Sequence, residues 1–310
     1  MKISFILLIF IGSISLASTV DIQRAKKYEK EGNYKAAMQI YKKLYESKDE
    51  AKNTYYENLD KTADSKTNSS LKQILTKNFN LYPYKKNYFL PITYDSNKKD
   101  DRKKFETKFQ FSIQKPIVHN FLGLNETISF GYTQKSFWQT TKDSAPFRET
   151  NYMPEIFLKA PVVHNYLKGY KVSFIHESNG RDEQNSRSWN RIYLQSYLQF
   201  DELFVIPKVW SRIPEDKKND DNPNIEDYYG YGDLKLVYPY KKHLFELTLK
   251  NNLKFDEDNK TSAKFDYTFP LTNSNQDTFG YLQIFHGYGD SLIDYDKKIN
   301  RIGFGISLSR

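Results

Sequence analysis

Three side chains within residues 170–200 (YKVSFIHESNGRDEQNSRSWNRIYLQSYLQF) have the chemistry needed for acyl transfer. Ser178 supplies a hydroxyl nucleophile, His176 an imidazole base, and Asn190 an amide that can orient the imidazole. Ser178 would attack an acyl carbonyl, and His176 would take the hydroxyl proton and return it to the leaving alcohol. Because an amide stabilises an imidazolium less than a carboxylate does, we expect additional electrostatic help for the oxyanion.

The segment that follows Ser178 has groups that suit this task. Residues 179–186 (NGRDEQNS) contain Gly180, whose backbone N–H is a candidate oxyanion donor. The same segment is rich in oxygen ligands for a hard cation such as calcium.

The spacing of these residues predicts which way they point. On a strand, His176 and Ser178 share a face because they are two residues apart, and Val172 and Phe174 lie on that same face. Asn190 likewise shares its face with apolar residues of the following strand. All three polar side chains are therefore predicted to lie on a lipid-facing wall, where polar groups are costly and need a reason.

Alternation with a period of two continues from about residue 85 to the end of the chain and is typical of a membrane barrel. In the last strand, for example, Ile302, Phe304, Ile306 and Leu308 alternate with glycine and serine. The predicted strands are 86–94, 104–114, 126–138, 149–159, 168–178, 188–199, 203–212, 230–240, 243–252, 262–270, 278–287 and 301–309. Twelve is an even number, as a closed barrel with both termini on one side requires.

The connections give a second indication of a barrel. Very short turns at 200–202 and 241–242 alternate with long polar segments, as expected if the long loops face outward and the termini lie in the periplasm. The long segments are 139–148, 179–187, 213–229 and 288–300. We therefore predict an all-β transmembrane barrel of about twelve antiparallel strands, with a short N-terminal helical extension.

The N-terminal part of the chain divides into two predicted segments. Residues 1–17 have a basic start, an apolar core and small residues near Ala17, which indicates a secretory signal peptide, since the apolar core is short for a retained anchor. Residues 18–84 form a predicted periplasmic extension that precedes the barrel at 85–310. Within this extension, residues 21–47 have helical spacing around a turn at Gly32. A plain helical hairpin is favoured over a tetratricopeptide unit, because one such unit cannot bury its own face.

Composition narrows the function classes. The absence of cysteine among 310 residues excludes disulfides, thiolate metal sites and a cysteine nucleophile. With 47 Lys and Arg against 38 Asp and Glu, the net charge of +9 is mild for this size and does not indicate nucleic acid as a partner. Export without a spanning helix predicts a bacterial envelope location, and the barrel pattern places the protein in the outer membrane.

The motifs also carry a family resemblance. His-x-Ser-Asn-Gly-Arg, followed by Ser-Arg-Ser-Trp-Asn-Arg, resembles the outer-membrane phospholipase A family. Further matching blocks occur in order along the chain from about residue 82: YTQKS at 132–136, PFRETNY at 146–152, NPN at 222–224 and YGDSLIDY at 288–295.

The resemblance implies a twelve-stranded barrel that hydrolyses acyl esters of phospholipids and lysophospholipids, with A1, A2 and lysophospholipase activity. It implies dependence on Ca²⁺ and activation by homodimerisation in the membrane. By position, Ser178 resembles the nucleophile, His176 the base, Asn190 the orienting residue and Gly180 the oxyanion donor. In the same way, the Arg181 carbonyl and the Ser186 hydroxyl resemble calcium ligands, Ser144 the ligand donated by the partner subunit, and Gln134 a dimer-interface residue.

Two features depart from the family pattern: the extension at 18–81, and a C-terminus, Ser307-Leu-Ser-Arg310, that lacks a terminal aromatic residue. Two alternatives to the enzyme stay open on sequence alone. One is a passive outer-membrane channel. The other is a barrel that anchors a periplasmic protein-docking module formed by residues 18–81.

Overall fold

The computed structural model describes residues 21, 23–42, 81–97, 102–216, 220–271 and 278–309. The chain divides between Phe79 and Asn80 into two units, which are described separately. The predicted signal peptide and the segment 48–80 lie outside the described residues.

The described part of the first unit is a helical hairpin. Residues 23–30 and 34–42 are helical, and Gly32 adopts a φ of 72° in the turn between them. Glycine takes this left-handed conformation without steric cost, which explains why the first helix ends there. Ala25 and Ala37, one from each helix, are buried. The helical extension is therefore confirmed within residues 21–42.

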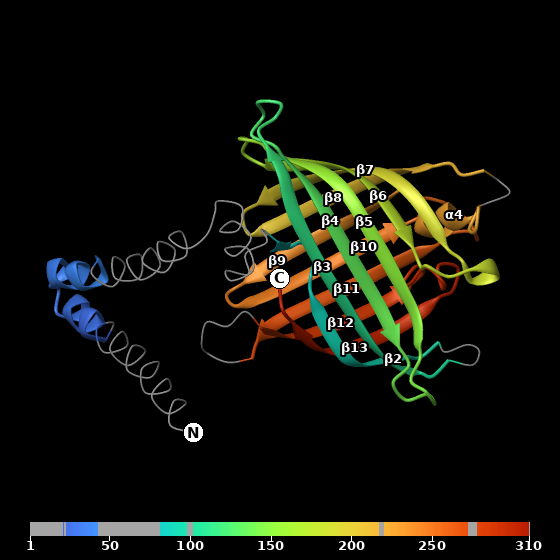
Figure 1. Cartoon of the computed structure of the whole chain (residues 1–310), viewed down its shortest axis with the longest axis horizontal. Helices are drawn as coiled ribbons and strands as arrows, with labels where there is room; N and C mark the ends of the chain where they lie inside the picture. The colour runs from blue at the N-terminus through green and yellow to red at the C-terminus, as the bar shows by residue number, and fades with distance from the viewer. Residues whose placement is uncertain are drawn as a thin grey trace, which may run out of the picture. The chain divides into compact units, whose positions relative to one another are not determined.

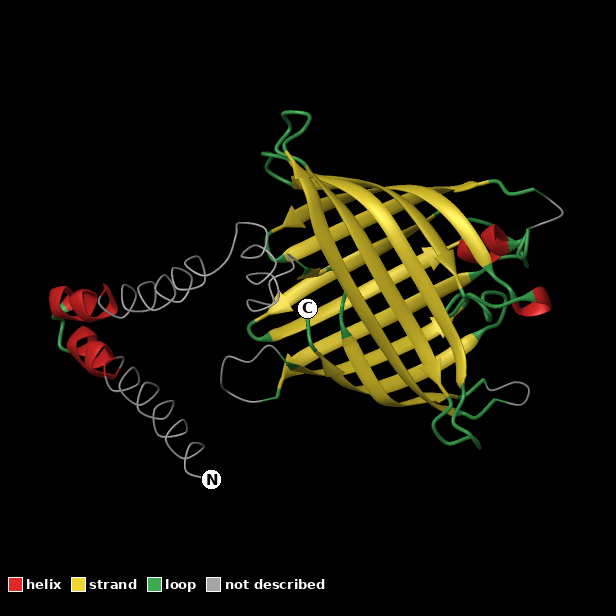
Figure 2. Ribbon diagram, viewed as in Figure 1, coloured by secondary structure: helices red, strands yellow, loops and turns green. Residues whose placement is uncertain are grey.

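The second unit is a closed barrel (Figures 1 and 2). Each of the strands β2 to β13 pairs antiparallel with its neighbours in sequence, and β13 closes the ring by pairing with β2. Within the described residues, the strands are β1 (Tyr82–Pro83), β2 (Tyr88–Asp95), β3 (Phe105–His119), β4 (Thr127–Trp138), β5 (Phe147–Pro161), β6 (Leu167–Ser178), β7 (Ser188–Phe200), β8 (Leu203–Ile213), β9 (Gly232–Tyr240), β10 (His243–Asn251), β11 (Thr261–Pro270), β12 (Phe279–Gly287) and β13 (Ile299–Ser307).

The predicted twelve-stranded barrel is confirmed, and the predicted strands match β2 to β13 one for one. Three short elements were not predicted: β1, which pairs with β3, the 3₁₀ turn η1 (Glu183–Asn185), and the helix α4 (Ile225–Tyr229). Elements this short do not extend far enough to establish a hydrophobic period, so the sequence pattern does not reveal them. No helix within the described ranges is long and apolar enough to cross a membrane.

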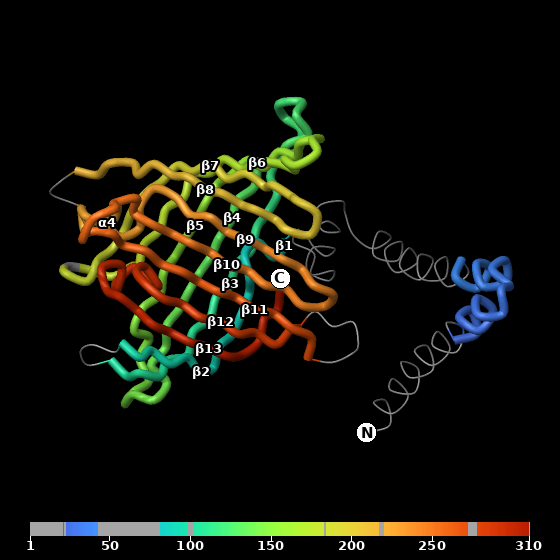
Figure 3. Tube along the Cα trace, turned by 180° about the vertical axis from the view of Figure 1, so that it is seen from behind, coloured from blue at the N-terminus to red at the C-terminus, as the bar shows by residue number. Residues whose placement is uncertain are grey.

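The connections are unequal at the two ends of the barrel. Two-residue turns join β7 to β8 and β9 to β10, whereas the loops that contain η1 and α4 gather at the opposite end (Figure 2). The C-terminus lies on the side of the short turns, and the view from behind shows β9 to β13 completing the wall (Figures 1 and 3). The predicted alternation of long and short connections is confirmed, with the loops that contain η1 and α4 at one rim and the two-residue turns at the other.

The two faces of the wall differ in chemistry. Apolar side chains such as Phe304, which is 59% exposed, project outward, while the inward side chains are largely polar or charged and buried. Glu106 pairs with Arg301 at 2.9 Å, and Asp290 pairs with Arg301 at 2.8 Å and with Lys108 at 2.6 Å. Paired charges therefore occupy the interior, and this network ties the wall to the loop between β12 and β13.

Candidate active site

His176 and Ser178 lie at the C-terminal end of β6, next to the loop that contains η1, and on the outer face of the strand. Along β6 the inward residues, including Glu177, are buried, whereas Val172 and Phe174 on the outer face are 42% and 43% exposed. His176 and Ser178 continue this outer row and are half-buried. The predicted orientation toward the outside of the barrel therefore holds in the structure.

Asn190 lies directly beside His176 on the neighbouring strand. The two residues are Cα partners in the ladder between β6 and β7, so their side chains project to the same side. His176 Nδ1 is 2.9 Å from Asn190 Oδ1. Because an amide oxygen only accepts, Nδ1 carries the proton in this contact and Nε2 keeps a lone pair for a general base.

Gly180 follows Ser178 in a left-handed conformation with a φ of 61°. A Cβ at this position would approach the ring of Tyr152 to 3.1 Å, and Tyr152 is itself the Cα partner of Ser178 on β5. Within the described chain, neither the Gly180 N–H nor the Ser178 hydroxyl has a hydrogen-bond partner. A donor and a nucleophile, both available, thus lie two residues apart.

The loop after Gly180 is held by the buried side chain of Asn179. Its Oδ1 accepts hydrogen bonds from the backbone N–H groups of Arg181, at 3.3 Å, and Arg187, at 3.0 Å. Farther along this loop, the Ser186 hydroxyl donates to Asp221 Oδ2 at 2.5 Å. The loop between β6 and β7 is thereby attached to the loop between β8 and β9.

These groups fit a hard cation only in part. Ser186, Asp221 and the backbone carbonyls offer oxygen alone, which is the donor type that calcium prefers. Calcium takes about six to eight oxygens, however, and the described residues contain no group of three or more His, Cys, Asp or Glu side chains arranged for a metal. A calcium ion here would therefore need oxygens from water or a second chain.

Ser144 lies apart from these residues, in the loop between β4 and β5. It is exposed, its φ is 60°, and its hydroxyl makes no hydrogen bond within the described chain. Trp138 holds the loop by donating from Nε1 to the carbonyl of Ala145 at 2.7 Å. Within one chain, the structure does not bring Ser144 into contact with Ser186.

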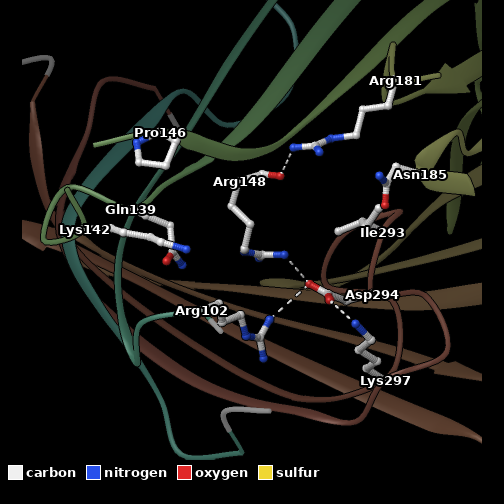
Figure 4. A pocket seen from close by; sticks show the side chains of 10 residues that line it. All are labelled: Arg102, Gln139, Lys142, Pro146, Arg148, Arg181, Asn185, Ile293, Asp294 and Lys297. Atoms are coloured by element: carbon white, nitrogen blue, oxygen red, sulfur yellow. Dashed lines mark hydrogen bonds and ion pairs between the residues drawn. The ribbon is translucent and has the colours of Figure 1, made fainter. Parts of the chain in front are cut away.

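A charged cavity of about 330 Å³ lies at the rim between these loops (Figure 4). Asp294 accepts hydrogen bonds from Arg102 at 3.1 Å and Arg148 at 2.6 Å, and it pairs with Lys297 at 3.5 Å. Burial acts to raise the pKa of Asp294, but the charges of Arg148 and Arg102 outweigh it and lower the pKa. The Arg181 guanidinium donates to the Arg148 carbonyl, so this cluster anchors the loop that follows the nucleophile.

Two residues beside the site escaped the sequence analysis. Asp221 contacts Ser186, and Glu215 Oε1 accepts a hydrogen bond from Asn190 Nδ2 at 3.1 Å. The sequence does indicate the outer face for Glu215, because this residue lies two positions beyond Ile213 and so continues the outward alternation of β8. For Asp221 only its place just before the NPN block, at 222–224, pointed to the site.

Comparison with known proteins places the chain in a family. The family model described as phospholipase A1 matches residues 63–308. Phospholipase A1 of Salmonella typhimurium is 36% identical over 247 residues, which are 74% of this chain and 82% of that protein. A relative from Neisseria meningitidis is 40% identical over 216 residues, 66% of this chain, and the match spans only about half (55%) of that protein's length.

Solved structures agree with the sequence matches. Outer membrane phospholipase A from Escherichia coli superposes with a TM-score of 0.68 at 33% identity, covering 74% of this chain and 99% of that one. The Salmonella typhi outer membrane phospholipase dimer with bound calcium also gives a TM-score of 0.68 at 33% identity, covering 75% of this chain and 93% of that one. These matches confirm the predicted resemblance, and the chain belongs to the phospholipase A1 family of outer-membrane enzymes.

Proposed function

We propose that this outer-membrane phospholipase cleaves acyl esters of phospholipids and lysophospholipids with Ser178 as nucleophile, His176 as general base and Asn190 as orienting residue. The observation that carries the proposal is the 2.9 Å contact between His176 and Asn190 on the outer wall, next to Ser178. Hydrolysis at both the A1 and the A2 position is part of the proposal.

In the first step, the Ser178 oxygen forms a bond to the acyl carbon while His176 Nε2 takes the hydroxyl proton. The tetrahedral intermediate then breaks its ester C–O bond, and His176 returns the proton to the leaving alcohol. The products are an acylated Ser178 and a lysophospholipid, or a deacylated headgroup when the substrate is a lysophospholipid.

In the second step, water attacks the acyl group while His176 takes one of its protons. Collapse breaks the bond to Ser178, and the proton passes from His176 to the serine oxygen. A fatty acid leaves, and the site returns to its starting state. Throughout, Asn190 Oδ1 accepts from Nδ1 and keeps the ring in the required tautomer.

The oxyanion of both steps needs donors, and we assign the backbone N–H of Gly180 to this role. Its N–H has no other partner in the described chain, and it follows directly after the segment that carries Ser178. We assign the Arg181 carbonyl and the Ser186 hydroxyl as calcium ligands, with the Asp221 carboxylate adding negative charge beside them. Bound calcium would supply positive charge near the oxyanion.

Activation by a second copy fits the polarity of the outer wall. Tyr132, Gln134, Ser136 and Thr150 form a row of side-chain hydrogen bonds across β4 and β5. The row faces the side on which lipid would otherwise lie, where polar groups gain from a protein partner. We propose that two chains meet along this row and that Ser144 of each supplies an oxygen to the calcium of the other, consistent with its exposure.

The substrate would enter sideways from the outer leaflet. Val172, Phe174 and Ile192 are exposed on the outer wall below the site, and they offer an apolar track for one acyl chain. Cleavage at this position needs no passage through the barrel, whose interior is occupied by paired charges.

A nucleophile assay tests the proposal. Ser178→Ala should abolish fatty-acid release from phospholipid in detergent micelles with calcium, while the barrel still folds, as judged by its gel mobility before and after heating. A sulfonyl fluoride should label Ser178 in the unmodified protein. Release by Ser178→Ala at the original rate, or labelling at another serine, would remove Ser178 from its role.

The channel alternative receives no support from the interior. Several charges that line the wall are buried and paired, as between Glu106 and Arg301. Planar bilayers containing the purified protein should therefore show no steady conductance.

The docking alternative has one favourable observation. On the second helix of the extension, Tyr34 and Met38 are 70% and 73% exposed and are spaced by one helical turn. An apolar stripe of this kind suits a periplasmic protein as partner, in addition to the enzyme activity. Photo-crosslinking from position 38 in whole cells should give an adduct, and its absence would argue against a docking role.

A further inference from the structure

We propose that Glu215 is a positioning residue that fixes the Asn190 amide and adds negative charge to the hydrogen-bonded row behind His176. This inference rests on the proposed function, because it gives Glu215 a role only if His176 is the base. It adds a fourth residue to the proposed set of Ser178, His176 and Asn190, and hydrogen bonds join His176, Asn190 and Glu215.

Glu215 reaches the row through the order of the strands. Ile213, the last residue of β8, is the Cα partner of Asn190 on β7. Glu215 follows two residues later, so its side chain returns to the outer face that carries Asn190. His176 and Asn190 thus come from β6 and β7, and Glu215 from the segment just after β8, and each contacts the next across the outside of the wall.

The contact determines how the Asn190 amide is turned. An ionised carboxylate only accepts hydrogen bonds, so Glu215 Oε1, at 3.1 Å, selects the NH₂ side of the amide. The amide oxygen must then face His176 Nδ1, as observed at 2.9 Å. Without Glu215, the amide could rotate and present its NH₂ group to the ring, which would place the imidazole proton on the nitrogen that must act as base.

Glu215 also supplies a negative charge, which the neutral Asn190 amide lacks. The imidazolium that forms during the reaction has a neutral partner in Asn190, whereas a carboxylate would stabilise it directly. Glu215 places a negative charge one amide farther away, along the same hydrogen bonds. In the described part of the chain, Glu215 forms no ion pair.

The test moves the negative charge from position 215 to position 190. Glu215→Gln removes the charge and gives Asn190 a partner that can donate, so kcat should fall about tenfold while KM changes less than about twofold. Asn190→Asp alone places two carboxylates against each other, which is unfavourable. In that background, Glu215→Gln supplies a donor to the new carboxylate and should raise kcat.

Opposite effects of Glu215→Gln on kcat in the two backgrounds would separate a positioning role from a structural one. A residue that only stabilises the loop would lower kcat in both backgrounds or in neither, and either result would overturn the proposal. Glu202→Gln, the same change in an exposed turn between β7 and β8, should leave kcat unaltered and is the matched control. Urea midpoints of all variants show whether a loss follows from unfolding.

Failure of this inference is distinguishable from failure of the proposed function. If Ser178→Ala is inactive and Glu215→Gln equals the unmodified protein, the role of Glu215 falls and the catalytic assignment stands. If Ser178→Ala keeps its activity, the catalytic assignment itself falls, and the role of Glu215 falls with it.

Discussion

Replacing Gly180 by alanine tests the oxyanion donor against a control elsewhere in the same barrel. Gly180 and Gly123 both have positive φ, 61° and 74°, so alanine at either position carries the same backbone penalty of about 1–2 kcal/mol. Their surroundings differ, because a Cβ on Gly123 meets nothing within 4 Å, whereas a Cβ on Gly180 lies 3.1 Å from the Tyr152 ring. Of the two glycines, Gly180 is next to the proposed catalytic residues and Gly123 is not.

The two variants should therefore lose similar stability but very different activity. We expect both to lower the free energy of unfolding by about 1–2 kcal/mol, with a small extra cost at Gly180 from Tyr152. Alanine keeps the backbone N–H but disfavours a φ of 61°, and its Cβ would lie 3.1 Å from the Tyr152 ring, so we expect the peptide that carries the N–H to turn away from the oxyanion. Loss of one oxyanion donor costs about 10²–10³-fold in kcat, and this is the upper limit of the decrease that we expect for Gly180→Ala, which displaces the donor without removing it.

Fatty-acid release in micelles with saturating calcium measures kcat, and urea unfolding followed by tryptophan fluorescence measures stability. Saturating calcium ensures that a shift in calcium affinity does not appear as a loss of turnover. Equal kcat values for Gly180→Ala and Gly123→Ala would refute the assignment of the Gly180 N–H as oxyanion donor. A loss of kcat in both variants would instead trace the effect to stability.

Three further predictions concern charge and metal. Asp290→Asn should lower the free energy of unfolding by about 3–5 kcal/mol in urea titrations, because buried Lys108 would lose its carboxylate and Arg301 one of its two close carboxylate partners. Burial acts to raise the pKa of Asp290, but the charges of Lys108 and Arg301 outweigh it and lower the pKa. The stability that Asp290 contributes to the fold is therefore complete above the ordinary pKa of 3.8 and is lost as the pH falls below it. Urea midpoints should drop in that range, and less so in Asp290→Asn. Excess EDTA should abolish fatty-acid release and added calcium should restore it, with Ser186→Ala needing more calcium for half-maximal activity; full activity in EDTA would exclude a calcium role.

The sequence predicted the barrel well because a membrane wall imposes a strict pattern. Each strand has lipid on one side and a polar interior on the other, so an error of one residue would reverse every side chain. In β13, Ile302 and Phe304 point outward and Arg301 points inward, as the alternation indicates. The same rule predicts the outer face for His176 and Ser178, and the structure has them there.

The sequence did not predict the contacts that Glu215 and Asp221 make at the site. Glu215 meets Asn190 across 25 residues of sequence, and Asp221 meets Ser186 across 35. Both contacts depend on strand register and on the way a loop folds back over the rim. Periodicity within one strand contains neither piece of information.

The inner and outer faces of β6 and β7 cooperate at the site. Glu177 lies between His176 and Ser178 in sequence, yet it points inward, where it accepts from Arg191 at 2.5 Å and from the Trp189 indole at 3.2 Å. Arg191 and Trp189 flank Asn190 in the same way. The inner ion pair therefore fixes the register at the residues where the outer His176–Asn190 contact occurs. A slip of one residue would break both contacts at once, and this coupling explains how a half-buried polar pair on a lipid-facing wall keeps its geometry.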